Sequence, residues 1–125
     1  MAIHKFARLI EQGKPISIYG DGTMSRDFTY IDDIIDGTVA AMGKCDGFHI
    51  YNLGESRPIT VNDLVAEIEK ALGKKAIKEY VPFQPGDVER TYADVTKAVS
   101  ELGYNPKTKI EDGLAKFVTW LRQND

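Results

Sequence analysis

The sequence lacks the features of a disulfide-stabilised, membrane-spanning or nucleic-acid-binding protein. Its one cysteine, Cys45, excludes an internal disulfide and is typical of a reducing, cytoplasmic compartment. No apolar run approaches the length of a membrane span, and the N-terminal residues show no signal-peptide pattern. The net charge is −3 and there is no long basic run, so neither a nucleic acid nor a membrane is expected as a partner.

Several motifs of enzyme chemistry are also missing. The glycines form neither Gly-x-Gly-x-x-Gly nor Gly-x-x-x-x-Gly-Lys, so no phosphate-binding loop opens a helix. No tyrosine is followed four residues later by lysine, and there is no Gly-x-Ser-x-Gly elbow. Nucleophilic catalysis therefore has no support in the sequence.

A metal site is not expected either. The acidic residues Asp32, Asp33 and Asp36 fall at a predicted helix start, where the helix dipole favours negative charge. The spacing of Cys45 and His49 is a weak metal signal without further ligands.

The remaining composition suits one compact domain spanning residues 1–125, with 42% hydrophobic and 28% charged residues. Apolar periodicity predicts helices and short strands in alternation, which favours an α/β or α+β fold. The strands are too few and short for a complete doubly wound sheet. The predicted helices are 2–12, Asp32 or Asp33 to Met42, Thr60 to Leu72, Asp94 to Leu102 and 110–121, and the predicted strands are 16–19, 26–31, 48–53 and 76–81.

Arg26 is the first candidate for ligand binding. Its guanidinium has several rigid donors that match phosphate oxygens, and it follows a flexible turn between Gly20 and Gly22. The alternative is a surface salt bridge, for example with Asp27, and Arg26 by itself favours that alternative.

The strand before that turn offers apolar and aromatic surface. A nucleobase could lie along Ile18 and Tyr19 while Arg26 meets a diphosphate. The alternative is a core strand with one aromatic edge, which the composition favours.

Three further polar residues suit a hydroxyl-rich ligand. The amide of Asn52 can donate and accept at the end of a predicted strand, although turn-forming asparagines are commoner. Gln84 and Asp87 lie on a proline-bracketed loop, which could equally be an ordinary polar loop. Arg90 could add a second cation or pair with Asp87 or Glu89.

Four motifs in order resemble a known family. The chain is similar to the C-terminal portion of extended short-chain dehydrogenases/reductases, and within them to nucleotide-sugar epimerases and dehydratases of the UDP-glucuronate 4-epimerase type. The resemblance implies an incomplete Rossmann-type enzyme that lacks the N-terminal cofactor-binding domain. The motifs are Gly20-Asp-Gly-Thr-Met-Ser-Arg-Asp-Phe-Thr-Tyr-Ile-Asp-Asp33, Tyr51-Asn-Leu-Gly54, Pro82-Phe-Gln-Pro-Gly-Asp87 and Tyr92-Ala-Asp94.

The resemblance implies a role for each candidate residue. Arg26 matches the arginine that contacts the diphosphate of the sugar nucleotide. Ile18 and Tyr19 match the strand against the base, and Asn52 matches an asparagine on the substrate side. Two further matches, Gln84 and Asp87, fall in a loop that closes over the nucleotide, where many relatives have arginine in place of Gln84.

The resemblance also implies what this chain cannot do alone. In the family, a glycine-rich loop binds NAD and a Tyr-x-x-x-Lys pair performs the chemistry, and both precede the matching region. We therefore expect a chain that binds a UDP-sugar, such as UDP-glucuronate or UDP-galacturonate, without binding NAD or catalysing epimerisation alone. The alternatives are a stand-alone binding module and a non-catalytic remnant. In either case we expect self-association or a cofactor-binding partner segment to cover exposed apolar surface.

Overall fold

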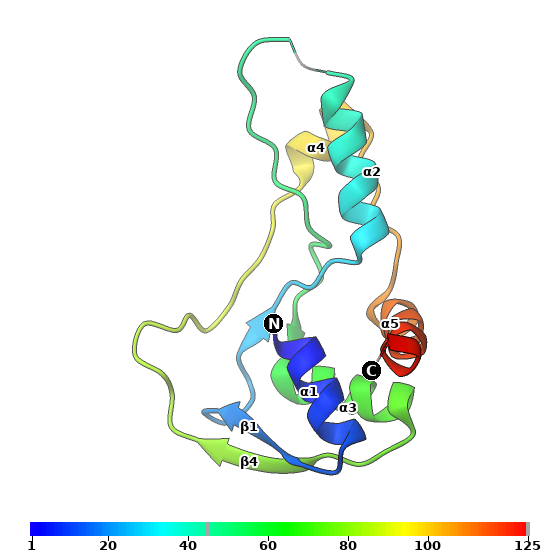
Figure 1. Cartoon of the computed structure of the whole chain (residues 1–125). Coiled ribbons are helices and arrows are strands. Elements are labelled where there is room, and N and C mark those ends of the chain that lie inside the picture. The colour runs from blue at the N-terminus through cyan, green and yellow to red at the C-terminus, as the bar shows by residue number, and fades with distance from the viewer. Residues whose placement is uncertain (45, 125) are drawn as a thin grey trace.

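Helices and short strands alternate along the chain, as predicted, in a computed structural model that describes residues 1–44 and 46–124 (Figure 1). The predictions for Cys45 lie outside the described residues. The fold class is α/β, as the sequence indicates. The elements are α1 (Ala2–Glu11), β1 (Pro15–Tyr19), β2 (Ser25–Arg26), α2 (Ile31–Met42), β3 (Ile59–Thr60), α3 (Val61–Leu72), β4 (Ile77–Val81), α4 (Thr96–Leu102) and α5 (Ile110–Asn124).

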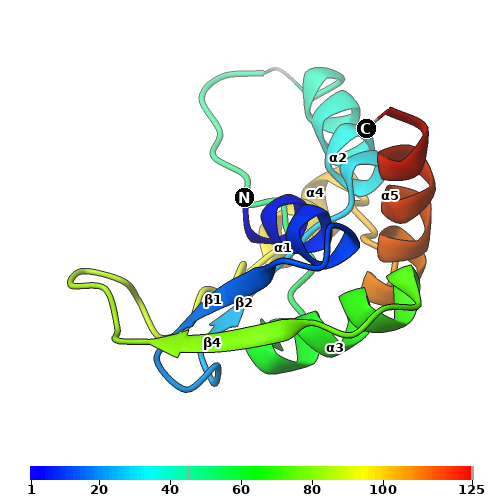
Figure 2. The same ribbon diagram turned by 60° about the horizontal axis from the view of Figure 1, so that its bottom comes forward.

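The core lies between the helices α1, α3 and α5 and a short parallel sheet. β1 pairs in parallel with β4, with Ile18 opposite Tyr80, and α1 and α3 pack beside this sheet (Figure 2). The side chains of β1 alternate, so that Ile16 and Ile18 are buried while Tyr19 is partly exposed. Each fully buried aliphatic side chain stabilises the fold by about 1.5–3 kcal/mol. The buried cluster comprises Phe6, Ala7, Ile10, Ile16, Ile18, Leu64, Val65, Ile68, Leu72, Leu114, Val118 and Leu121.

Three helix ends are each determined by a single residue at that end. The hydroxyl of Thr60 accepts a hydrogen bond from the amide of Asp63 at 3.1 Å and caps α3. Gly73 and Gly103 end α3 and α4 in the left-handed conformation, at φ 68° and 67°. These three predictions are confirmed.

The predicted aspartate caps of two other helices are wrong. α2 begins after Tyr30 without a side-chain cap, because Asp33 turns inward and accepts from the backbone N–H of Thr108 at 2.9 Å. At α4 the N-cap is Val95, and Asp94 instead accepts from the amide of Thr96 at 3.0 Å. In both cases the carboxylate accepts a hydrogen bond from a backbone amide, but the aspartate is not the N-cap residue of the helix.

Two predicted strands are not formed as expected. In and around the predicted strand 26–31, only Ser25 and Arg26 form a ladder, which is antiparallel to β3, a strand that was not predicted. The chain then enters α2. The predicted strand 48–53 has no ladder partner among the described residues, and Phe48 and Ile50 are exposed. An alternating apolar pattern becomes a strand only where a neighbouring strand supplies hydrogen bonds.

α2 exposes most of its apolar side chains. It stands with α4 at one end of the molecule, away from β1 and β4 (Figure 1), and its buried residues are Asp33 and Gly37. Among the described residues, no helix is long and apolar enough to cross a membrane. The exposed apolar face, called here the α2 stripe, comprises Ile31, Ile35, Val39 and Met42, which are 51–70% exposed.

Candidate functional site

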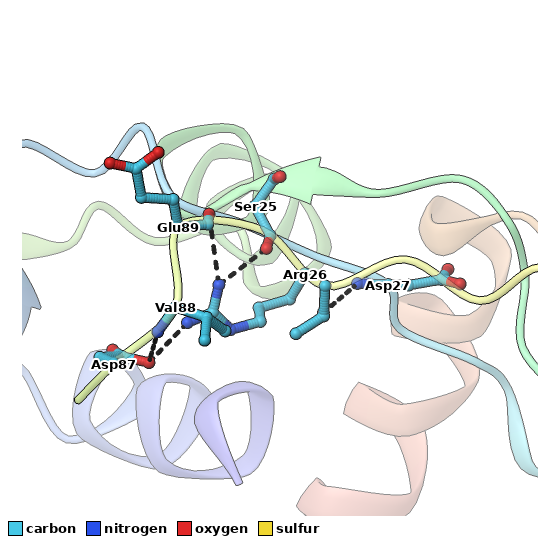
Figure 3. A network of polar contacts seen from close by, with 7 residues as sticks. Ser25, Arg26, Asp27, Asp87, Val88 and Glu89 are labelled. Carbon is cyan, nitrogen blue, oxygen red and sulfur yellow. Dashed lines mark hydrogen bonds and ion pairs between the residues drawn. The ribbon is translucent and has the colours of Figure 1, made fainter.

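Arg26 is fixed at the end of β2 by three acceptors (Figure 3). Its Nη2 lies 2.7 Å from Oδ1 of Asp87, and Nη1 donates to the carbonyls of Ser25 at 2.8 Å and Glu89 at 3.4 Å. The side chains of Arg26 and Asp87 are 23% and 32% exposed. The suggested salt bridge with Asp27 is therefore wrong, because the carboxylate partner of Arg26 is Asp87. Since that pair is rigidly placed and reachable from solvent, it can meet an anionic ligand.

The segment that carries Asp87 is held along β2 by backbone hydrogen bonds. The amide of Ser25 donates to the carbonyl of Glu89 at 2.9 Å, and the amide of Thr91 donates back to Ser25 at 3.1 Å. The hydroxyl of Thr91 accepts from the amide of Asp27 at 3.2 Å. These bonds join segments about sixty residues apart and set the position of the Arg26–Asp87 pair.

The Arg26–Asp87 pair lies at a pocket of about 300 Å³, called here the α1–β1–β2 pocket. Of the predicted residues, Ile18, Tyr19, Arg26 and Asp87 line it. Its volume is at the lower end for small-ligand sites. Most of the other lining residues are apolar; together they are Met1, Ala2, Lys5, Phe6, Ser17, Met24, Phe28, Val61 and Leu64.

A second polar network, around Asp27, supports the pocket from behind Arg26. The carboxylate of Asp27 accepts from the amides of Ser56 at 3.0 Å, Arg57 at 3.3 Å and Ala93 at 3.2 Å. Ser56 has a positive φ of 55°, which is uncommon for a residue with a side chain. Asp27 thus holds a turn of unusual backbone conformation against the segment that leads from Asp87.

Inside that turn lies a buried acidic group. Glu55 is 7% exposed, and neither of its carboxylate oxygens has a hydrogen-bond partner among the described residues. Burial, together with the negative charges of Asp33 and Asp27, raises the pKa of Glu55 against the opposing effect of Arg57. Burial and the same acidic neighbourhood raise the pKa of Tyr104 to about 12, and its hydroxyl donates to the carbonyl of Gly54.

No metal-binding arrangement accompanies these acids. Over residues 1–44 and 46–124, histidine, cysteine, aspartate and glutamate form no group of three or more that could hold a metal ion. The chemistry available at the pocket is therefore that of hydrogen-bond donors, one carboxylate and apolar walls.

Comparison with known proteins covers nearly the whole chain. The family model described as GDP-mannose 4,6 dehydratase matches residues 1–117. The chain belongs to the NAD-dependent nucleotide-sugar epimerase/dehydratase family. Within that family its relatives include UDP-glucuronate 4-epimerases.

Named relatives and solved structures agree on this assignment. The UDP-glucuronate 4-epimerase of Thermodesulfobacterium geofontis is 46% identical over 125 residues, covering 99% of this chain and 38% of the relative. The UDP-glucuronic acid 4-epimerase of Bacillus cereus, solved with UDP-glucuronic acid and NAD, matches with a TM-score of 0.91 and 38% identity over 98% of this chain and 40% of that one. MoeE5, solved with the same two ligands, gives a TM-score of 0.94 at 33% identity over 100% and 42%. The chain spans less than half the length of each of these proteins.

Within this epimerase-type chain, the predicted site residues fall into two groups. Four line the pocket, although Ile18 as a whole is fully buried in the core. Asn52 lies elsewhere and donates to the carbonyl of Asp94 at 3.3 Å. Gln84 is exposed beyond the lining, and its carbonyl accepts from the amide of Asp87 at 3.1 Å. The ligand-binding roles of all six residues stay predictions.

The other arginine of this region does not join the Arg26–Asp87 pair. The guanidinium of Arg90 lies 5.7 Å from the centre of the Tyr92 ring, and no ion pair to Asp87 or Glu89 is present among the described residues. The favourable contact is with the ring face.

Sequence patterns missed three contributors to the site of the epimerase-type chain. Lys5 and Phe6 line the pocket from α1, and Asp27 organises the loops behind it. The helical pattern of α1 indicates its buried face but not which element lies beside its first turn. Asp27 stands next to Arg26 within the family motif, and that position was the one available signal.

Proposed function

We propose that this chain binds the nucleotide diphosphate of a UDP-sugar in the α1–β1–β2 pocket, as the sugar-nucleotide-binding portion of an epimerase-type enzyme. The observation that carries the proposal is the fixed Arg26 guanidinium at the mouth of a largely apolar pocket. The Bacillus cereus and MoeE5 structures, which were solved with UDP-glucuronic acid, support it.

Each wall of the pocket suits one part of such a ligand. The base would lie against the β1 backbone and Tyr19, where the wall is apolar and aromatic. The diphosphate would meet Arg26, since a guanidinium binds phosphate oxygens with paired donors. The carboxylate of Asp87 would accept from ribose hydroxyls. Asn52 and Gln84 would act at the sugar side and in the closing loop.

In this proposal the chain contributes binding and no proton or hydride transfer. The resemblance assigns the reaction to oxidation at the sugar C4 position, rotation of the keto intermediate and reduction on the other face. We assign no NAD contact to these residues, because the sequence contains no Gly-x-Gly-x-x-Gly loop that opens a helix. The chain's single cysteine supports the cytoplasm as its compartment.

Titration calorimetry with UDP, UDP-glucuronate and UDP-galacturonate tests the binding proposal. The wild-type chain should bind at least UDP, and Arg26→Ala should weaken binding about tenfold or more, because it removes a charge-assisted contact. Arg57→Ala is the matched control, since the Arg57 side chain is 63% exposed and outside the pocket lining. Absence of both heat and a thermal shift at millimolar UDP would contradict the proposal.

We also propose that the chain alone covers the α2 stripe by self-association or by taking up a cofactor-binding partner segment. Support comes from α2 itself, which buries an aspartate and a glycine while exposing its isoleucine, valine and methionine side chains. Contiguous exposed apolar surface of this kind is typical of interaction sites.

A further inference from the structure

The charged side chains that line the α1–β1–β2 pocket differ in whether they have an ion-pair partner. The lining includes three charged side chains, Arg26, Asp87 and Lys5. Arg26 and Asp87 form an ion pair at 2.7 Å, and Arg26 also donates to two backbone carbonyls. Lys5 is exposed, and its ammonium group has no hydrogen-bond or ion-pair partner among the described residues. Of these three charged side chains, Lys5 is thus the one without a partner among the described residues.

This imbalance matters for a diphosphate, which carries more than one negative charge. The Arg26–Asp87 pair has no net charge, and the Asp87 carboxylate beside it repels an anion. In the neighbouring loop Gln84 is uncharged, and Arg90 lies over the Tyr92 ring and outside the pocket lining. A further positive group is therefore needed if the pocket is to attract a diphosphate.

α1 holds Lys5 in a place suited to this task. The next two residues, Phe6 and Ala7, are buried in the core, so the helix is firmly seated. Its ribbon runs beside the Arg26–Asp87 pair (Figure 3), and Lys5 shares the lining with both residues. The flexible four-carbon stem of a lysine lets the ammonium group follow phosphate oxygens while the backbone stays fixed.

We propose that Lys5 is the second cation of the diphosphate site and makes the pocket select phosphorylated nucleotides over nucleosides. This inference rests on the proposed function, whose pocket it shares. Lys5 would bind the diphosphate from α1, while Arg26 binds it from β2. Asp87 is then free to accept from ligand hydroxyls as Arg26 turns to phosphate.

Calorimetric titration of the full chain with UDP and with uridine tests this role. Lys5→Met should weaken UDP binding about tenfold and reduce its dependence on salt, because one charge-assisted phosphate contact is lost. Uridine binding should not change, since the base and ribose do not meet Lys5. Lys5→Arg should bind UDP nearly as well as wild type. Lys14→Met removes the same charge from an exposed position outside the pocket and should behave as wild type.

The outcomes separate this inference from the proposed function. If wild type binds UDP and Arg26→Ala weakens it, but Lys5→Met binds UDP as tightly as wild type, the role of Lys5 is refuted and the proposed function stands. An equal loss of UDP and uridine binding in Lys5→Met also refutes it, since that pattern indicates damage to the pocket rather than loss of a phosphate contact. If wild type takes up no UDP, both the proposed function and the role of Lys5 are refuted.

Discussion

Arg26 and Asp87, sixty-one positions apart in the chain, bind each other through a 2.7 Å contact between Nη2 and Oδ1. Both residues are expected to contact the ligand, so binding would redirect two groups that pair with each other in this structure. An ion pair that is partly exposed contributes little to stability. The pair therefore orients the site, and breaking it when a ligand binds should cost little free energy.

A double-mutant cycle measures that small contribution. We expect Arg26→Ala, Asp87→Ala and the double variant to give a coupling free energy of about 0.5 kcal/mol, because both side chains are open to solvent and salt. Urea denaturation at low salt is the measurement, and added salt should reduce the coupling. A coupling above about 2 kcal/mol would show that the pair is a structural element of the fold.

Asp27 should matter more for stability than either of those residues. Its carboxylate accepts from three backbone amides on two distant segments. Asp27→Ala should lower the free energy of unfolding by about 2 kcal/mol or more, because amides at Ser56 and Ala93 lose a charged acceptor. Asp36→Ala, on an exposed position with no side-chain partner among the described residues, is the control and should change it little. Equal effects of the two substitutions on urea denaturation would contradict this account.

The buried carboxyl of Glu55 predicts a pH dependence with a definite sign. Its pKa is raised in the folded chain, first by burial and then by Asp33. Below the ordinary value of 4.5, folded and unfolded chains are both protonated at this residue and it has no effect. As pH rises above 4.5, the unfolded chain releases its proton first, so Glu55 increasingly favours unfolding until its folded pKa is passed.

Glu55→Gln removes that titration. We expect the variant to gain roughly 1 kcal/mol of stability over wild type at pH 7 and to lose most of that gain near pH 4. Urea denaturation of both proteins across this range, compared as the difference at each pH, separates Glu55 from the other acids. A difference that is constant with pH would contradict a raised pKa for Glu55.

Much of the helical framework could be predicted because local residues decide it. Thr60, Gly73 and Gly103 set helix ends by hydrogen bonding or by backbone conformation within a few residues. The buried faces of α1, α3 and α5 follow from apolar spacing. Arg26 could also be identified as a candidate from the sequence, because the ability to bind phosphate belongs to its own guanidinium group.

The remainder depends on contacts between distant segments. Residues 48–53 have the alternation of a strand, but no described segment supplies their hydrogen bonds. Asp87 pairs with Arg26 only because residues 89–91 align with Ser25 across the chain. Lys5 likewise lines the pocket because α1 packs beside β1. No local sequence pattern predicts these contacts between distant segments.

The α2 stripe gives a last prediction, on association. Wild type should form dimers or larger assemblies at high concentration, since four exposed apolar side chains gain by leaving water. Ile35→Glu with Val39→Glu places two charges one turn apart on that stripe and should shift the chain to its single-chain mass in light scattering. The exposed positions of both residues should leave the thermal midpoint almost unchanged. Lys14→Glu changes the net charge by the same amount away from α2 and should still associate. A wild-type chain that stays monomeric at high concentration, or a Lys14→Glu variant that dissociates as fully as the α2 variant, would show that the stripe does not drive association.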